Sequence, residues 1–293
     1  MKLILFLVTL CTLTSYAELI PTHTDIAYGP DELTKFDFYQ AKGKGPHPLV
    51  FYIHGGGWIG GDKAEKKVPE RVIQGYLNKG ISYARINYRF SPLPTPVTDA
   101  AYALQFIKYH AEKYGINKNK VIVSGGSAGA ATCLNLLFQD DMADPEAKDP
   151  ILRESTRIQG AVTANGQSSI DIKLLDEWMG PNGPRHGMIC RAMGEKNNTA
   201  LLKNYDKHKA MIDRFSAMTH VDKNDPPLFM TYGKDISVPA KNAGHGIHHG
   251  IFGIKLLEKA KEVGHESHLS IPGHSQSKKY KNSSEFIDAI LLK

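Results

Sequence analysis

The chain has 293 residues, of which 41% are hydrophobic, 23% charged and 9% aromatic. These proportions are those of an ordinary globular protein, and they exclude a disordered chain, a collagen-like repeat and a small disulfide scaffold. Lysine plus arginine number 36 against 30 for aspartate plus glutamate, which gives a formal net charge of +6. This excess is spread along the chain, so it favours solubility and gives no indication of a nucleic-acid partner.

The first 17 residues have the pattern of a secretory signal peptide. A lysine is followed by an apolar stretch that is too short to span a bilayer, and Ser15-Tyr16-Ala17 offers small residues at the cleavage positions. We therefore expect cleavage before Glu18, one domain over residues 18–293, and a secreted or periplasmic location. A buried N-terminal strand or an uncleaved anchor is the alternative. No later segment has about 18 consecutive apolar residues, so no membrane span is expected.

Short apolar strands alternate with amphipathic helices, which predicts an α/β fold with a mostly parallel sheet and helices on both faces. Residues 20–39 are expected to form an antiparallel pair of strands around a turn at residues 28–31. In chain order, the other expected elements are strands at 48–53 and 81–87, a helix at 97–114, a strand at 121–123, a helix at 128–138, strands at 158–163 and 227–232, a helix at 250–263, a strand at 268–271 and a helix at 283–292. Residues 166–226 are long for a connection and predict an insertion near the site.

A glycine-serine motif, Gly125-Gly126-Ser127-Ala128-Gly129, lies between an expected strand and an expected helix. A nucleophile at such a tight turn needs small residues two positions away on both sides, because larger side chains would collide there. The amide of Ala128 would stand at a helix N-terminus, where its unpaired N–H can receive an oxyanion. The motif therefore predicts Ser127 as a catalytic nucleophile.

A second glycine motif, His54-Gly55-Gly56-Gly57-Trp58, follows the strand that is expected to end at residue 53. Consecutive glycines let the backbone approach a ligand closely. The amides of Gly56 and Gly57 are expected to complete an oxyanion hole with Ala128. His54 belongs to this loop, so we interpret it as a hydrogen-bonding partner within the loop and not as the base.

A serine hydroxyl needs a base, and the base needs a carboxylate to orient it. With the chain order Ser, Asp, His, the acid follows a late strand and the base follows the last one. Asp235 and His274 occupy these two places and are the predicted acid and base. The competing residues precede the same strands and would lie at the wrong end of the sheet; they are Asp222, Asp225, His265 and His268.

Together these motifs resemble the hormone-sensitive-lipase-type branch of the α/β-hydrolase esterases, and the chain is similar also to bacterial feruloyl and acetyl-xylan esterase-like hydrolases. The resemblance runs from about residue 48 to the C-terminus and includes Asn87-Tyr88-Arg89 and Asp99. The lipase-type pattern reads Gly-Asp-Ser-Ala-Gly-Gly, whereas Gly126 and Ala130 stand in its flanking places here. The resemblance implies an α/β-hydrolase fold, a serine esterase activity and no cofactor. Few residues precede His54, so an N-terminal helical cap is not expected.

The substrate expected from these features is a short-chain or carbohydrate-linked ester of acetyl or feruloyl type, by analogy. Trp58 and Trp178 are candidates for a substrate platform, with the core of the protein as the alternative for each. A serine peptidase of the prolyl-oligopeptidase type and a non-catalytic binding protein on the same fold remain as other functions. The sequence does not determine the oligomeric state.

Two further clusters have no predicted catalytic role. His245, His248 and His249 lie close together, but no metal motif such as His-Glu-x-x-His accompanies them, so we expect polar or packing histidines at a helix start and no metal site. The acidic segment at residues 140–144 is expected to be a solvated loop. Cys133 and Cys190 would remain after cleavage, either as a disulfide or as buried free thiols.

Overall fold

The computed structural model describes residues 18–65, 67–183 and 185–293, and it contains one eight-stranded sheet with the order β1-β2-β4-β3-β5-β6-β7-β8. The strands are β1 (His23–Ala27), β2 (Lys35–Tyr39), β3 (His47–Ile53), β4 (Ser82–Ile86), β5 (Ile116–Gly126), β6 (Gly160–Ala164), β7 (Leu228–Thr231) and β8 (Ser267–Ser270). β1 and β2 pair antiparallel, as do β2 and β4, and every other neighbouring pair is parallel. The expected mostly parallel sheet is confirmed.

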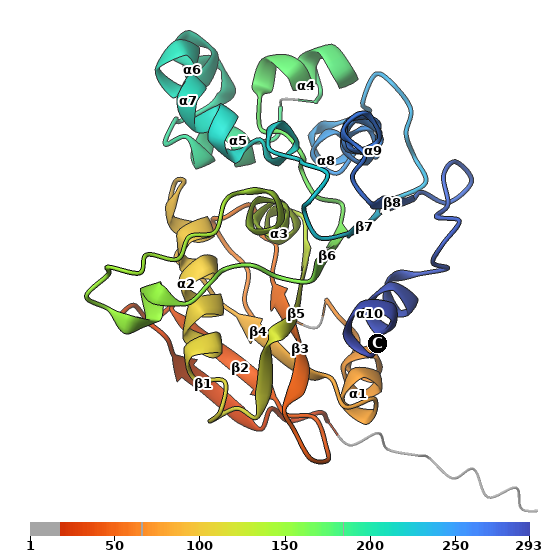
Figure 1. Cartoon of the computed structure of the whole chain (residues 1–293). Helices are drawn as coiled ribbons and strands as arrows, with labels where there is room; N and C mark the ends of the chain where they lie inside the picture. The colour runs from red at the N-terminus through yellow and green to blue at the C-terminus, as the bar shows by residue number, and fades with distance from the viewer. Residues whose placement is uncertain (1–17, 66, 184) are drawn as a thin grey trace, which may run out of the picture.

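Helices cover both faces of this sheet (Figure 1). α1 (Glu70–Asn78) and α10 (Ser283–Leu291) pack on one face, against the side chains of a smaller apolar cluster. An ion pair of 2.6 Å between Lys79 Nζ and Asp288 Oδ2 joins these two helices. The larger apolar cluster fills the opposite face under α2 (Thr95–Tyr109), α3 (Ala128–Phe138) and α9 (Ile251–Val263). Each face of the central strands is therefore buried, which explains their nearly continuous apolar sequence.

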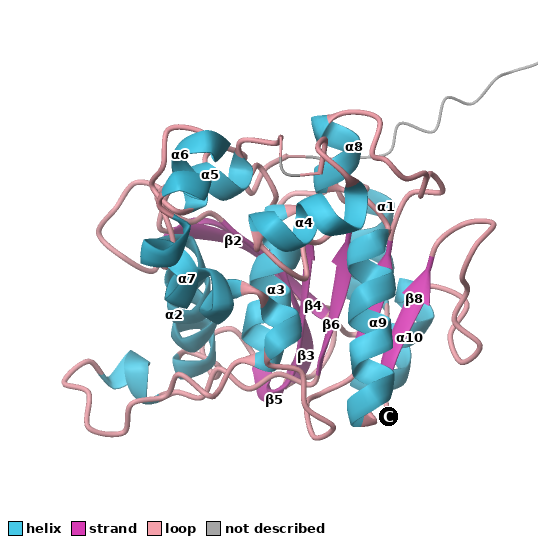
Figure 2. Ribbon diagram, turned by 90° about the horizontal axis from the view of Figure 1, so that it is seen from above, coloured by secondary structure: helices cyan, strands magenta, loops and turns pink. Residues whose placement is uncertain are grey.

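The long connection between β6 and β7 contains helical segments of its own. These are α4 (Ile172–Met179), α5 (Met188–Ala192), α6 (Asn198–Lys203), α7 (Tyr205–Phe215) and the 3₁₀ turn η2 (Ala217–Thr219), and another 3₁₀ turn, η1 (Pro150–Arg153), precedes β6. The short helix α8 (Ala243–Ile247) follows β7. The parallel strands point toward the side of the molecule on which α5, α6 and α8 lie (Figure 2). The predicted insertion thus stands near the carboxyl ends of the strands, where parallel sheets bind their ligands.

Several local expectations can be compared with the structure. The expected helix at 128–138 is observed with these bounds. Cys133 and Cys190 are both buried free thiols, which settles the question of a disulfide between them. α1 was not predicted, although Ile73, Tyr76 and Leu77 have helical spacing and are buried. Within the described residues, no helix has the length and apolar character that crossing a membrane requires. The expected signal peptide lies outside the described residues and stays a prediction.

Candidate active site

Ser127 stands at a sharp turn between β5 and α3. Its backbone has φ of 54° and ψ of −122°, a left-handed conformation that a residue with a side chain adopts only when its surroundings enforce it. The two flanking glycines of the motif explain how the turn closes. A Cβ atom on Gly125 would lie 2.6 Å from the carbonyl carbon of Gly129, and a Cβ atom on Gly129 would collide with the carbonyl oxygen of Ile53. The spacing of the motif is therefore a packing requirement of the strand-to-helix turn.

The glycine loop after β3 lies beside this serine. Gly56 and Gly57 have φ of 104° and 66°, a conformation that favours glycine, and both line the same cavity as Ser127. A Cβ atom on Gly56 would overlap the carbonyl oxygen of Gly60. Among the described turn and loop hydrogen bonds, none is donated by the amides of Gly56, Gly57 or Ala128. These three amides remain available for a negatively charged oxygen, and their role as an oxyanion hole stays a prediction.

Buried side chains hold the glycine loop in place. The hydroxyl of Tyr88 donates to the carbonyl oxygens of His54 and Gly55, each at 2.9 Å. The imidazole of His54 is buried, stacks on the Tyr88 ring at a centroid distance of 4.4 Å, and contacts the Gly55 carbonyl through Nδ1 at 2.6 Å. Burial lowers the pKa of His54, so its ring is neutral at physiological pH. His54 is thus part of the loop's internal framework, as the sequence indicated.

The Asn87-Tyr88-Arg89 segment at the end of β4 contributes two further contacts. The Asn87 side chain accepts a hydrogen bond from the Lys63 amide and donates one of 2.9 Å to Asp62 Oδ2. The guanidinium of Arg89 forms two hydrogen bonds with the Asp99 carboxylate, at 2.6 and 2.9 Å. These contacts tie the loop after the glycines and the start of α2 to the end of β4, which accounts for the motif in structural terms.

The side chain that meets the serine is His248, at the C-terminal end of α8. Its Nε2 lies 2.9 Å from Ser127 Oγ. Removal of water around the ring lowers the pKa of His248 below its usual 6.5, and an interaction with the backbone of Gly244 partly opposes this shift. A histidine that is neutral near pH 7 and bonded to a serine hydroxyl is suited to accept its proton. No carboxylate among the described residues forms an ion pair with His248.

Neighbouring contacts fix the position of His248. The buried side chain of Gln167 donates a hydrogen bond of 2.6 Å to the carbonyl of Ile247, directly before His248. His245 contacts the carbonyl of Asp235 at 3.0 Å, and His249 contacts the carbonyl of Ser237 at 3.2 Å. His245 and His249 therefore have the packing role that the sequence predicted for the whole cluster. His248 differs from both because it faces the serine, and no spacing rule in the sequence separates it from them.

The structure does not bring Asp235 and His274 to the serine. Asp235 follows β7 as expected, but its carboxylate pairs with Lys241 Nζ at 2.6 Å and accepts a hydrogen bond of 2.8 Å from the Ser237 hydroxyl. The ion pair with Lys241 is the main cause of a pKa well below the usual range of an aspartate. His274 is exposed in a tight turn that the bridge between Ile271 and Ser275 closes. The assignment of this acid and this base stays a prediction, and the observed neighbour of Ser127 differs from it.

The two tryptophans are placed differently from each other. Trp58 is fully buried, and its indole Nε1 donates a hydrogen bond of 3.0 Å to the Thr132 hydroxyl within the core. Its backbone has φ of 60°. Trp178 is partly buried and packs edge-on against Phe252, with centroids 6.1 Å apart. Neither tryptophan lines the cavity beside Ser127, so the structure places both in packing positions and not on a substrate platform.

The cavity beside Ser127 has a volume of about 740 Å³ and a mixed lining. Apart from the glycines and His248, its polar and charged wall residues are Tyr52, Glu65, Lys67, Asn165, His186 and Arg191. Glu65 and Lys67 form an ion pair of 3.2 Å with each other. The lining therefore offers both hydrogen-bond donors and hydrogen-bond acceptors to a polar substrate.

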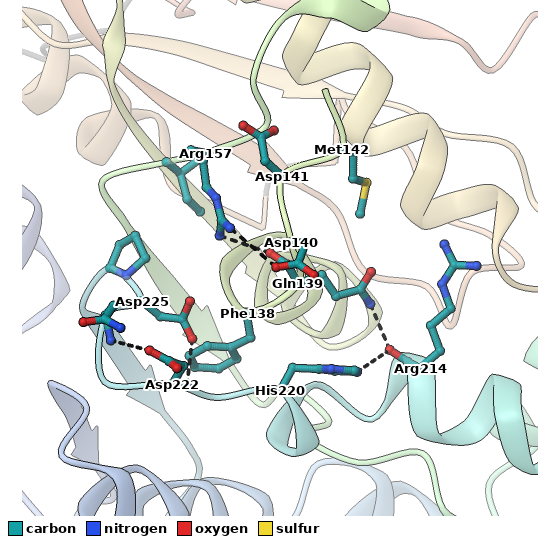
Figure 3. A pocket seen from close by; sticks show the side chains of 13 residues that line it. Phe138, Gln139, Asp140, Asp141, Met142, Arg157, Arg214, His220, Asp222 and Asp225 are labelled. Carbon is teal, nitrogen blue, oxygen red and sulfur yellow. Dashed lines mark hydrogen bonds and ion pairs between the residues drawn. The ribbon is translucent and has the colours of Figure 1, made fainter. Parts of the chain in front are cut away.

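A second large cavity lies near the amino ends of β6 and β7 (Figure 3). Its polar side chains mostly bind one another or nearby backbone: Arg157 pairs with Asp140 at 3.8 Å, and Asp225 accepts a hydrogen bond of 2.8 Å from the Asp222 amide. No cluster of three or more potential metal ligands lies in the part of the chain that the structure describes. This cavity lacks a nucleophile with an adjacent base, so we assign the candidate chemistry to the cavity of Ser127.

Comparison with known proteins gives a family and a fold. The sequence pattern of the BD-FAE family matches residues 36–245. The probable carboxylic ester hydrolase LipM of Mycobacterium tuberculosis is 30% identical over 226 residues, which cover 75% of this chain and 47% of that protein. The versiconal hemiacetal acetate esterase of Dothistroma septosporum is 29% identical over 216 residues, which cover 72% of this chain and 55% of that protein. The chain thus spans about half the length of these relatives.

Solved structures share the same architecture at lower identity. A truncated carbohydrate esterase from gut microbiota superposes with a TM-score of 0.71 at 17% identity, covering 94% of this chain and 99% of that one. An acetyl ester-xyloside bifunctional hydrolase from Caldicellulosiruptor lactoaceticus gives 0.65 at 20% identity, covering 89% of both chains. These likenesses establish the predicted α/β-hydrolase fold.

Proposed function

Since the chain belongs to the BD-FAE family, we propose that it is a serine carboxylic ester hydrolase in which Ser127 is the nucleophile and His248 the base. The observation that carries this proposal is the contact of 2.9 Å between Ser127 Oγ and His248 Nε2, at a left-handed turn beside free backbone amides. Two relatives support the same reaction, because their names specify a carboxylic ester hydrolase and an acetate esterase.

The first half of the reaction forms an acyl-enzyme. The neutral imidazole of His248 accepts the hydroxyl proton while Ser127 Oγ attacks the carbonyl carbon of the ester. The carbonyl oxygen gains the negative charge, and the amides of Gly56, Gly57 and Ala128 donate hydrogen bonds to it. His248 then gives its proton to the leaving alcohol as the carbon–oxygen bond breaks. The acyl group stays on Ser127.

The second half releases the acid. Water takes the place of the alcohol, His248 removes a proton from it, and the resulting nucleophile attacks the acyl carbon. Collapse of the second tetrahedral intermediate returns the proton to Ser127. His248 lacks a carboxylate partner among the described residues, so the backbone at Gly244 and the Gln167–Ile247 hydrogen bond provide its orientation in this mechanism.

The polar cavity supports a carbohydrate-linked ester with a short-chain acyl group as the substrate class. Asn165, His186 and Arg191 stand around Ser127 and can bind the hydroxyl groups of a sugar. Two structural neighbours are described as a carbohydrate esterase and an acetyl ester-xyloside hydrolase, which agrees with this class. A secreted or periplasmic enzyme would meet such substrates outside the cell. Mass determination of the mature N-terminus tests the proposed cleavage before Glu18.

Hydrolysis of p-nitrophenyl acetate and of acetylated xylan tests the proposed activity directly. The wild-type protein is expected to release acetate from both substrates and to be labelled on Ser127 by a fluorophosphonate. The Ser127→Ala variant is expected to lose labelling and hydrolysis while keeping its thermal unfolding midpoint. Hydrolysis that persists in Ser127→Ala at the wild-type rate would contradict the proposed nucleophile.

A further inference from the structure

A smaller cavity continues from the active site into the opposite layer of the fold. It has a volume of about 260 Å³ and lies between the sheet and the helices α1 and α10. It shares four lining residues with the cavity of Ser127, namely Tyr52, Lys67, Gly126 and Ala164. The two cavities are therefore adjacent, and the boundary between them lies one residue from the nucleophile.

Aliphatic side chains form one part of the wall of this smaller cavity, and polar residues form the rest, namely Tyr52, Lys67, Tyr76, Tyr83, Ser124, Thr231 and Ser283. Val50 and Val162 enter it from β3 and β6, Val72 from α1 and Ile287 from α10. Val50, Val162 and Ile287 are buried members of the apolar cluster on this face, and Val72 packs against it. The volume is several times the roughly 30 Å³ that one water molecule occupies in the liquid, so the cavity has room for a chain of several carbon atoms. The aliphatic side chains offer a surface against which an apolar group can pack.

Gly126 is one of the four residues at the boundary between the two cavities, and it has no side chain there. Side chains at alternate positions of a strand share one face, so Gly126 faces the same layer as Ser124, which also lines the smaller cavity. A Cβ atom on Gly126 would meet only the carbonyl oxygen of Ala164, at 3.9 Å. The hormone-sensitive-lipase-type motif, which this segment resembles, has an aspartate at this place. Glycine therefore leaves open a passage that a side chain would occupy.

The position of His248 separates the two halves of an ester. α8 and α9 pack with the larger apolar cluster, on the face of the sheet that α3 covers, and His248 reaches Ser127 from there. The base must protonate the leaving oxygen, so the alcohol half lies on the side of His248. The acyl half then extends to the other side, toward Gly126 and the face of α1 and α10.

We propose that the cavity between the sheet and α1 and α10 is the acyl-binding pocket of the enzyme, entered past Gly126, and that it accepts unbranched apolar acyl groups of about four to six carbons. This inference rests on the proposed esterase function and adds the acyl specificity to it. Each methylene buried in the pocket is expected to raise kcat/KM about fourfold, the fold-change that corresponds to ~0.8 kcal/mol.

The test is the ratio of kcat/KM for p-nitrophenyl hexanoate to that for p-nitrophenyl acetate. The wild-type ratio is expected to be at least ten. Gly126→Val closes the passage and is expected to lower the ratio at least tenfold. Val162→Ala enlarges the pocket and is expected to move the preferred chain from hexanoate toward octanoate. Gly75→Val adds the same side chain in α1, where a Cβ atom meets nothing within 4 Å, and is expected to leave the ratio unchanged.

The possible failures are distinguishable. Acetate hydrolysis that depends on Ser127, with the same ratio in wild type, Gly126→Val and Val162→Ala, overturns the acyl pocket and leaves the esterase proposal intact. If Gly126→Val lowers activity on all esters alike, the acyl-chain length that Val162→Ala prefers tests the proposal. The same preferred length in Val162→Ala and the wild type then overturns the proposed acyl pocket. Absence of hydrolysis of every ester by the wild-type protein overturns both proposals.

Discussion

Replacement of His248 by asparagine tests the central contact of the site. The change removes the only described side chain within hydrogen-bonding distance of Ser127 Oγ. General bases contribute about 10²–10⁴-fold to rate. Because His248 has no described carboxylate partner, we expect the lower part of this range, about 10²–10³-fold, which equals roughly 3–4 kcal/mol of transition-state stabilisation. The expected loss is in kcat, with little change in KM, since the base acts on the proton in transfer.

The assay compares His248→Asn with His274→Asn on p-nitrophenyl acetate. His274 is exposed in the turn after β8, so its replacement is expected to leave kcat within about twofold of wild type. The thermal unfolding midpoints of both variants should match the wild type. If His274→Asn loses activity and His248→Asn keeps it, the chain must rearrange in solution to the triad predicted from the sequence, and our assignment of the base is refuted.

The pH dependence of the wild-type enzyme follows from the same histidine. Only the neutral imidazole accepts the serine proton, and loss of surrounding water holds the pKa of His248 below its usual 6.5. The value of kcat/KM is therefore expected to rise as the pH increases through a midpoint below 6.5 and then to level off. A midpoint above 7 in a kcat/KM profile between pH 4 and 9 would contradict this environment for the base.

Three stability predictions follow from other residues. Gly129→Ala places a methyl group against the Ile53 carbonyl, and we expect a loss of more than 3 kcal/mol in denaturant unfolding; wild-type stability would contradict the packing of the turn. Asp99→Asn breaks the pairing with Arg89 and should cost about 2–3 kcal/mol by the same measurement, whereas a loss below about 0.5 kcal/mol would show that the pair contributes little. Burial lowers the pKa of Lys108 from its usual 10.5 to about 8. Between pH 8 and pH 10.5 the unfolded chain binds more protons than the folded chain, so the free energy of unfolding rises by up to about 1.4 kcal/mol per pH unit. The Lys108→Met variant is expected to lack this rise, and an equal pH dependence of stability in the variant and the wild type would contradict the prediction.

The sequence was sufficient to predict features that depend on residues close together in the chain. The spacing of Gly125, Ser127 and Gly129 predicted a tight turn between an expected strand and an expected helix, and the structure shows the backbone contacts that require the two glycines. The alternation of apolar strands and amphipathic helices likewise predicted the sheet with its two helical layers. In both cases the information lies within a few residues of the feature, so a single sequence contains it.

The partner of the serine depends on how distant segments meet, and here sequence reasoning was insufficient. The chain contains 13 histidines, and position after a strand selected His274. The observed contact instead follows from the hydrogen bond of Gln167 to Ile247, which holds the end of α8 over β6, and from the bridge that folds the segment after β8 back on itself. Trp58 shows the same limit, because its indole binds Thr132, a residue 74 positions away in the sequence.

Among the described residues, two unpaired thiols lie buried in different helices of the same apolar cluster. Cys133 is buried within α3 against the sheet, and Cys190 is buried in α5, in the connection that stands over the site. Burial raises the pKa of both thiols, so neither reacts with an alkylating reagent while the chain around it stays closed. Their modification rates under native conditions are therefore expected to report exposure of α3 and exposure of α5, and the two rates can be compared. If the connection that contains α5 opens before the central layer, Cys190 is modified faster than Cys133, and equal rates indicate that both parts open together.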